Sequence, residues 1–142
     1  MEPLQRLTRR QLEALRFIAA HPAQGRGVAL NAIATGLGVS PPSALAHLGP
    51  LEELGLIRRF RGKSLITHRG EGCLEEYLRH HRLAESLFAR AGLSAEATHA
   101  AALEVDLALS HRTVEEICGA GGHPKVCPHG EPIAPCGSRD RR

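Results

Sequence analysis

Two pairs of metal-binding side chains stand at helical spacing in the second half of the sequence. His81 and Glu85 lie four residues apart, and His99 and Asp106 lie seven apart, with Gly92 between the two segments. Residues at these spacings share one face of a helix, so the two faces can be laid together. Two imidazoles with one or two carboxylates suit Fe²⁺, Mn²⁺ or Zn²⁺, which accept mixed nitrogen and oxygen ligands. The alternative is that each pair lies on an ordinary solvated helix face.

A second group of metal-binding residue types follows in the segment after residue 122. Cys127, His129 and Cys136 lie there among prolines, preceded by His123. Thiolates and imidazoles are ligands of structural zinc sites, and thiolates hold iron–sulfur clusters. This spacing matches no standard zinc finger. Two interpretations remain open: a Cys/His site for metal or redox sensing, or a proline-rich loop that packs back on the helices.

The stretch from Leu30 to Thr67 has the pattern of a winged helix-turn-helix, a DNA-binding module. A short amphipathic helix precedes a glycine-rich turn, and Ser40 is a good N-cap for a second helix that starts at Pro41 and ends at Gly55. Helix-turn-helix spacing alone is weak evidence, because many helical corners share it. The ordered combination of cap, proline start and glycine stop is stronger.

The predicted wing is a hairpin of two strand-like runs, 56–60 and 64–67, joined by residues 61–63. Its basic tip suits phosphate contacts and predicts steeply salt-dependent binding. Pro50 disagrees with the pattern, because an interior proline costs a helix ~3 kcal/mol. We therefore expect a kink there, or a recognition helix confined to 41–48. The basic residues of the wing are Arg58, Arg59, Arg61 and Lys63.

Charge is distributed unevenly along the 142 residues. Residues 1–71 contain ten Lys/Arg and five Asp/Glu, a balance of +5, whereas residues 72–142 contain eight and ten, a balance of −2. Six of the nine histidines lie after residue 79. A basic first half and a second half rich in histidine and carboxylates suggest one part for DNA and another for a cation.

Other features limit the class of protein. Aromatic residues make up only 3% of the chain, so an aliphatic core is expected. Neither a signal peptide nor a membrane-length apolar run is apparent, which predicts a cytoplasmic protein with reduced cysteines. No nucleophile–base pair or cofactor loop is present, so an enzyme is not expected.

Caps and breakers predict the remaining elements. Thr8 and Gln11 fit a capping box for a first helix that ends near Ala20. After the wing, helices are expected at about 71–91, from Ser94 to about 109, and at 111 to about 118. A short β-edge near residues 24–27 that pairs with the wing is a further hypothesis. The prolines after residue 122 prevent regular structure, and residues 137–142 are expected to be disordered.

One string of residues resembles a known family. The string Tyr77-Leu-Arg-His-His81-Arg-Leu-Ala-Glu85, followed by His99 and a helix capped by Ser110, is similar to the iron-dependent repressors, the diphtheria toxin repressor family with its manganese-responsive members. The segment Gly-His-Pro-Lys-Val-Cys-Pro-His-Gly-Glu-Pro-Ile, which ends at residue 133, resembles a tail common in that family. The similarity spans about residues 8–135, without the SH3-like domain of the longer members. It implies a homodimer that binds a divalent metal between winged helix and dimerisation helices and then represses metal-uptake genes.

The resemblance also assigns residues by position. His81, Glu85 and His99 match one set of metal ligands, and Asp106 stands where the family has a glutamate that ligates in both of its sites. Glu13 falls where the manganese branch has a glutamate ligand. Three ligands of the regulatory site are replaced, since leucine has no lone pair and arginine is permanently cationic. The replacing residues are Arg10, Leu103 and Leu107.

The same resemblance places the start of the recognition helix at Ser40, Pro42 and Ser43. Small residues and proline there would contact thymine methyls and the backbone, and His47, one turn further on, would reach a phosphate or a base edge.

Three possibilities follow for regulation. A single ion at His81, Glu85, His99 and Asp106 controls the protein, or Cys127, His129 and Cys136 are the sensor, or metal control has been lost and the protein answers to redox state or to nothing.

Our interpretation is a mainly α protein with a winged helix-turn-helix at 1–70, a helical dimerisation and metal-sensing domain at 71–120 and an irregular tail at 121–142. It predicts a homodimeric repressor of metal-homeostasis genes that responds to Fe²⁺ or Mn²⁺, or to Zn²⁺, and binds an inverted-repeat operator. The rival class is a non-regulatory metal-handling protein that uses the tail.

Overall fold

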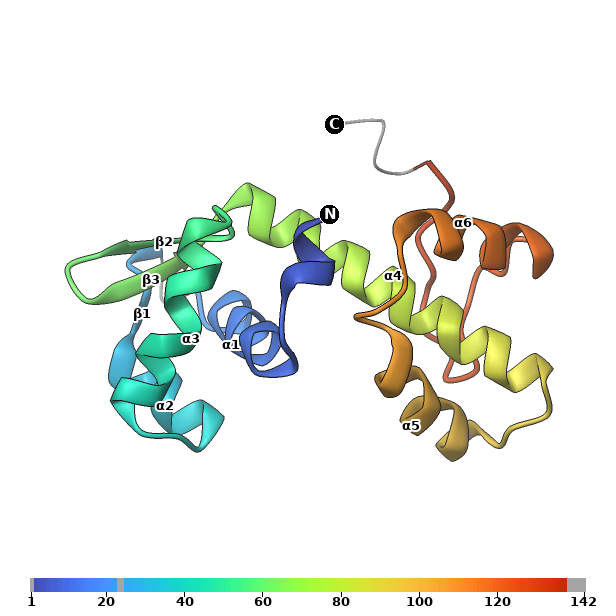
Figure 1. Ribbon diagram of the computed structural model, residues 1–142, viewed down its shortest axis with the longest axis horizontal. Helices are drawn as coiled ribbons and strands as arrows, with labels where there is room; N and C mark the ends of the chain where they lie inside the picture. The colour runs from blue at the N-terminus through green and yellow to red at the C-terminus, as the bar shows by residue number, and fades with distance from the viewer. Residues whose placement is uncertain (1, 23–24, 138–142) are drawn as a thin grey trace. The chain divides into compact units, whose positions relative to one another are not determined.

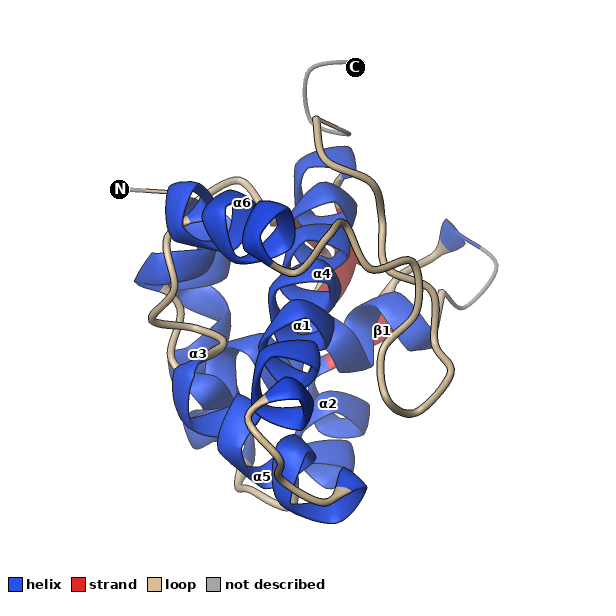
Figure 2. Cartoon of the chain, turned by 90° about the vertical axis from the view of Figure 1, so that its right-hand side faces the viewer, coloured by secondary structure: helices blue, strands red, loops and turns tan. Residues whose placement is uncertain are grey.

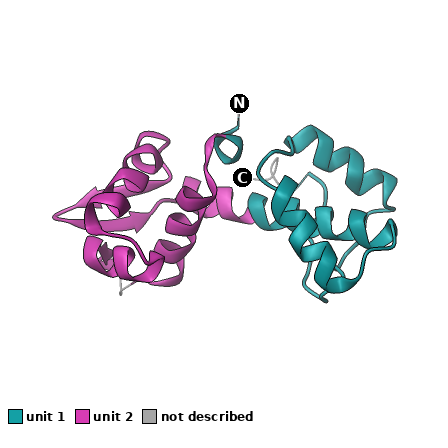
Figure 3. Cartoon of the chain, turned by 60° about the horizontal axis from the view of Figure 1, so that its bottom comes forward, with its two compact units in different colours: residues 1–5, 76–142 teal, residues 6–75 magenta. Residues whose placement is uncertain are grey.

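The computed structural model describes residues 2–22 and 25–137, and the chain forms two compact units. One unit comprises Arg6–Glu75, and the other comprises the short N-terminal segment together with the chain from Glu76 onward (Figure 3). The division falls inside a long helix, five residues beyond the expected boundary at residue 70. The tail belongs to the same unit as the helices that precede it.

The unit Arg6–Glu75 is a winged helix-turn-helix, as the sequence predicts (Figure 1). A short 3₁₀ helix at Pro3–Arg6 precedes it along the chain. Its elements are α1 (Arg9–Ala20), β1 (Val28–Ala29), α2 (Leu30–Leu37), α3 (Pro41–Glu53), β2 (Ile57–Phe60) and β3 (Lys63–Ile66), followed by the start of α4 (His68–Arg90).

Capping and aliphatic burial account for the helices of this unit. Thr8 and Gln11 form the expected capping box at the start of α1. Ser40 caps α3, where its hydroxyl accepts the backbone N–H of Ser43. The core is aliphatic, with fully buried side chains on each helix and at Leu56, just before β2: Leu12, Leu15, Ile18, Ile33, Leu48 and Leu51 lie on the helices.

The recognition helix α3 does not end at residue 48. It continues through Pro50 to Glu53, so the expectation of a helix confined to 41–48 is wrong. Leu48 and Leu51, on either side of the proline, are both completely buried. Burial of these two leucines stabilises the last turn against the local cost of the proline, because tertiary packing overrides propensity.

The wing is a three-stranded antiparallel sheet in the order β1-β3-β2. Lys63 is already the first residue of β3 and pairs with Phe60, so the connection has two residues, not the expected three. Both of these residues, Arg61 and Gly62, have positive φ (51° and 73°), which the tight type I′ hairpin turn requires. The hypothesised β-edge exists, but it lies at Val28–Ala29, just after the loop in which it was expected.

The second unit contains the rest of α4, then α5 (Ala95–Val105) and α6 (His111–Ala120). The middle helix is four residues shorter than predicted, because the chain turns at 106–108. α6 is two residues longer than predicted. The core of the second unit includes Leu83, Val114, Cys118, Cys127 and Ile133, so the tail contributes to the packing. Within the described parts of the chain, no helix combines the length and the apolar character needed to cross a membrane.

The tail after α6 is irregular, as predicted, but it follows an ordered path (Figure 2). Val126 and Pro132 form an isolated antiparallel bridge. The backbone N–H of Cys127 donates to Glu131 O at 2.8 Å, and that of Ile133 donates to Lys125 O at 2.9 Å. The tail therefore packs back on the helices, and this packing leaves its Cys and His side chains grouped as potential ligands. Of the stretch expected to be disordered, residues 138–142 lie outside the described residues.

Two glycines two residues apart at the start of α4 lie on different faces of the helix and provide a matched test of packing. A Cβ at Gly70 would lie 2.1 Å from Leu56 O and 2.8 Å from Ile66 Cγ1, whereas a Cβ at Gly72 would meet nothing within 4 Å. We predict that Gly70→Ala destabilises the protein by about 1–3 kcal/mol, because backbone must move. Gly72→Ala should stabilise it by about 0.5–1 kcal/mol through helix propensity. Chemical denaturation measures both, and equal effects would contradict the close approach.

Candidate metal centre

His81 and Glu85 form the base of a cluster of potential ligands on α4. They lie one helical turn apart, both buried, with His81 Nε2 3.1 Å from Glu85 Oε1. His99 on α5 completes the group, with its Nδ1 3.3 Å from His81 Nε2 and 3.9 Å from Glu85 Oε2. One ligand atom from each of the three residues lies within 4.8 Å of the others. The structure thus brings together three of the residues predicted from helical spacing.

Asp106 lies on the other side of His81. It follows the last residue of α5, is fully buried, and places Oδ2 2.9 Å from His81 Nδ1. A carboxylate there accepts a hydrogen bond from the Nδ1–H group of His81, which leaves the Nε2 lone pair directed at Glu85 and His99. Asp106 thus contacts His81 and is not grouped with the other potential ligand atoms, an arrangement in which outer carboxylates orient a ligating histidine in many metal sites. The role of Asp106 as a ligand stays a prediction.

The tail brings two further ligands to the same carboxylate. His129 Nδ1 lies 2.5 Å from Glu85 Oε2, and Cys127, His129 and Glu85 form a second group of potential ligands. The tail is held there by backbone hydrogen bonds and by Arg82, whose Nη1 donates to Pro132 O at 2.7 Å. The helical and tail candidates, separate in the sequence, meet at Glu85.

The chemistry of this cluster fits a divalent transition metal. Glu85 is 3% exposed, and its Oε2 atom is buried and accepts no hydrogen bond of good geometry, although imidazole nitrogens of His99 and His129 lie nearby. A buried carboxylate needs positive charge or donors to offset its desolvation. Three imidazoles, one carboxylate and one thiol are the mixed ligand set that Fe²⁺, Mn²⁺ and Zn²⁺ accept. Glu85 belongs to both groups and can bridge them.

Cys136 does not join Cys127 and His129. It lies with Cys118 and His123 in a separate group, with its Sγ 3.2 Å from Cys118 Sγ and 3.3 Å from His123 Nδ1. The hydrogen bond with Cys118, burial and nearby Glu115 raise the pKa of Cys136 to about 11. The predicted tail site is therefore divided between two places. Cys118 was missed because it lies in the apolar pattern of a helix.

A further group was not predicted at all. Glu76 and His80 lie one turn apart on α4, with His80 Nε2 3.5 Å from Glu76 Oε1, and His111 lies beside them at the start of α6. His80 is fully buried. The i,i+4 spacing was available in the sequence, but nothing there placed His111 opposite it.

The residues carried over from the resemblance on α1 have other contacts. Glu13 pairs with Arg10 at 3.1 Å, with both side chains largely exposed, and belongs to none of the described ligand groups. Leu103 is 40% exposed. The replaced regulatory positions thus carry no ligand atoms.

The predicted DNA-contacting residues lie on two elements of the winged helix. Ser40, Pro42 and Ser43 are exposed at the start of α3, and His47 is half-buried one turn later. On the wing, Arg58, Arg61 and Lys63 are exposed, whereas Arg59 is partly buried. The Arg61 guanidinium lies 5.1 Å from the centre of the exposed Phe60 ring.

Comparison with known proteins identifies the second unit. A family model described as iron dependent repressor, metal binding and dimerisation domain matches residues 67–135. Residues 67–135 belong to the iron-dependent repressor family. This family domain contains every member of the cluster around Glu85, and its relatives are transcriptional regulators rather than enzymes. No curated protein sequence matches the chain.

Solved structures extend the likeness to the winged helix. A hypothetical protein from Sulfolobus solfataricus is 26% identical, with a TM-score of 0.85 over 90% of this chain and 99% of its own. T. acidophilum IdeR, also 26% identical, has a TM-score of 0.60 over 89% of this chain and 59% of its own. ScaR with bound Zn²⁺ is 26% identical, with a TM-score of 0.70 over 87% of this chain and 58% of its own. The chain therefore spans under two thirds of these two regulators.

The role of Asp106 generates a prediction for metal affinity. Asp106→Asn keeps the size of the side chain but removes the charge that fixes His81, so metal affinity should fall by about 10–100-fold with stoichiometry retained. Glu104→Gln, an exposed position on α5, is the control and should leave affinity unchanged. Isothermal titration with Mn²⁺ measures both. Complete loss of Mn²⁺ binding in Asp106→Asn would instead indicate that Asp106 is itself a metal ligand.

Proposed function

We propose that this chain is a metal-responsive transcriptional repressor of metal-homeostasis genes, which binds an inverted-repeat operator as a homodimer when loaded with Fe²⁺ or Mn²⁺. The observation that carries the proposal is the buried Glu85 carboxylate, surrounded by ring nitrogens of His81, His99 and His129, in a chain that also has a winged helix. Family membership of residues 67–135 supports it.

The ligand set bears on the choice of ion. Imidazole and carboxylate ligands suit Fe²⁺ and Mn²⁺, whereas the thiol of Cys127 favours Fe²⁺ and Zn²⁺ over Mn²⁺. Glu85 and the Nε2 lone pair of His81 would hold the ion, which would supply positive charge beside the buried carboxylate. His81, held by Asp106, keeps that lone pair directed at the ion. Zn²⁺ is expected to compete for the same ligands.

The DNA-binding proposal rests on α3 and the wing. The exposed start of α3 presents small residues that suit the major groove, and the wing presents three exposed cations that suit phosphates. Affinity should therefore come largely from phosphates and sequence preference from α3.

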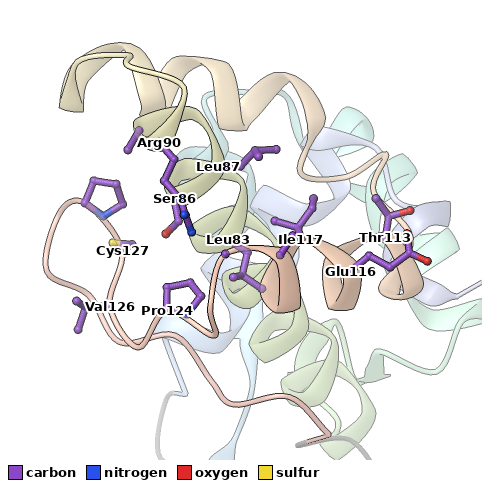
Figure 4. A pocket seen from close by; sticks show the side chains of 14 residues that line it. Leu83, Ser86, Leu87, Arg90, Thr113, Glu116, Ile117, Pro124, Val126 and Cys127 are labelled. Carbon is purple, nitrogen blue, oxygen red and sulfur yellow. The ribbon is translucent and has the colours of Figure 1, made fainter.

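An apolar groove in the second unit supports the homodimer (Figure 4). It lies between the end of α4, α6 and the tail, with a volume of about 650 Å³. Leu83, Leu87, Ile117 and Val126 line it, and Leu87 and Val126 are 45% and 58% exposed. Exposed apolar patches of this kind mark protein interfaces. We propose that a second copy of the chain occupies this groove, because residues 67–135 match a family model described as a metal binding and dimerisation domain.

Metal-dependent operator binding tests the function. A duplex selected in vitro with Mn²⁺ present should bind wild type about 5–150-fold more tightly with metal than without, the usual range of allosteric coupling. Glu85→Gln should lose this dependence, whereas the exposed control Glu104→Gln should keep it. Fluorescence anisotropy at fixed salt measures affinity. The same titration at DNA concentrations well above Kd should saturate at two chains per operator of two half-sites. Equal metal responses in both variants would exclude the Glu85 centre as the sensor.

The wing generates a separate prediction. Arg61→Ala should weaken binding to all duplexes alike and reduce the slope of log affinity against log salt by about one unit, because one phosphate contact is lost. Arg112→Ala, an exposed cation on α6, should leave the slope unchanged. A variant that loses discrimination at one base pair while keeping its salt slope would make Arg61 a base reader.

A further inference from the structure

Cys118, His123 and Cys136 form a compact sulfur-rich cluster away from Glu85. The Sγ atoms of Cys136 and Cys118 are 3.2 Å apart, and His123 Nδ1 lies 3.3 Å from the first and 3.5 Å from the second. Cys118 is 2% exposed, on the inner face of α6. The three ligand atoms make a nearly equilateral triangle.

The size of this triangle fits a tetrahedral ion. Zinc–sulfur bonds of ~2.3 Å and zinc–nitrogen bonds of ~2.1 Å place ligand atoms roughly 3.5–3.8 Å apart at tetrahedral angles. The observed separations lie within a few tenths of an ångström of that range. Three protein ligands would leave the fourth position of the ion to solvent.

The backbone around His123 is arranged to return its ring to α6. His123 has φ +55°, in the left-handed region that a non-glycine residue adopts at a cost. Its backbone N–H donates to Cys118 O at 2.8 Å. This conformation, which closes the end of α6, brings the imidazole of His123 back over the thiol of Cys118.

A buried arginine supports the third ligand. Arg79, 4% exposed, donates from Nε to Ala134 O at 3.0 Å and from Nη2 to Cys136 Sγ at 3.5 Å. Its Nη1 lies 2.8 Å from Glu115 Oε1. Arg79 thus fixes the chain beside Cys136 and places positive charge where a thiolate ligand needs it.

We propose that Cys118, His123 and Cys136 bind a Zn²⁺ ion, separate from the regulatory ion proposed at Glu85. Binding releases the thiol protons of the two cysteines to solvent, and both sulfurs become zinc-bound thiolates. Soft thiolates select Zn²⁺ over Mn²⁺, so this cluster, with two thiols and no carboxylate, should favour Zn²⁺ more strongly than the Glu85 centre, with one thiol and a carboxylate.

The position of the ligands gives this ion a mechanical role. His123 and Cys136 begin and end the loop that carries Cys127 and His129 to Glu85. A zinc ion bound to both closes that loop and anchors it to α6 through Cys118, which lowers the entropy lost when the loop is ordered. Zinc occupancy should therefore raise the affinity of the Glu85 centre for its own ion, a consequence that rests on the proposed function.

The first test counts zinc in the full-length protein. Wild type reconstituted with Zn²⁺ and then dialysed against Mn²⁺ should keep one zinc per chain by elemental analysis. Cys136→Ser and His123→Gly should lose that equivalent, whereas Cys73→Ala, at a buried cysteine on α4 outside the described ligand groups, should keep it. Retention of the zinc in both ligand variants would overturn the site.

The second test separates this cluster from the thiol at Glu85. In Cys127→Ala, Co²⁺ should still produce thiolate-to-cobalt charge-transfer absorption, and adding Cys136→Ser should abolish the two-thiolate intensity. If Cys127→Ala alone removes the absorption, the sulfur–metal bonds belong to Cys127 and the proposal fails. A Cys118–Cys136 disulfide in the protein as isolated would also overturn it. None of these measurements requires DNA, so failure of the repressor function remains distinguishable.

Thermal unfolding distinguishes loss of the zinc site in His123→Gly from a general loss of folding. Glycine adopts φ +55° without cost, so His123→Gly without metal should melt no lower than wild type without metal. Zn²⁺ should raise the Tm of wild type but not that of His123→Gly. An equal zinc-dependent rise in both proteins would contradict ligation by His123.

Discussion

The second unit depends on one buried carboxylate. Glu85 is 3% exposed on a long helix, and an isolated anion in that position would be prohibitively desolvated. The surrounding structure is arranged to offset this cost: histidines approach from α4, from α5 and from the tail. Asp106 then orients the nearest of these rings from the far side. Helix packing and the path of the tail together bring three imidazoles to one buried carboxylate.

The sequence predicts the winged helix well because its signals are local. A capping box at Thr8, an N-cap at Ser40 and positive-φ turn residues act over three or four positions, and each appears as expected. Helical periodicity also brings His81, Glu85 and His99 together. The error at Pro50 is instructive, because a local rule was outweighed by the burial of Leu51, which only the tertiary structure reveals.

The neighbours of Asp106, Cys136 and Cys118, which the sequence did not indicate, share a physical cause. Which nitrogen of His81 faces Asp106 depends on where α5 ends, and the helix stops at Val105, earlier than its apolar pattern indicates. The partners of Cys136 depend on the path of an irregular tail, which periodicity cannot describe. Cys118 lies among buried aliphatic side chains, where a cysteine reads as a small apolar residue. Side chains fixed by long-range contacts are the ones whose neighbours the sequence did not indicate.

The location of the tail ligands has a consequence for biosynthesis. Cys127 and His129 are translated after α6, whereas the winged-helix unit ends at Glu75, in the first part of α4. Domains of a nascent chain generally fold in the order in which they leave the ribosome. The winged-helix unit should therefore acquire its structure before all of the potential ligands around Glu85 have been synthesised. If the proposed function holds, each new molecule has a folded winged helix before it has a complete metal site. It can then bind the regulatory ion with all its ligands only after the tail has been synthesised.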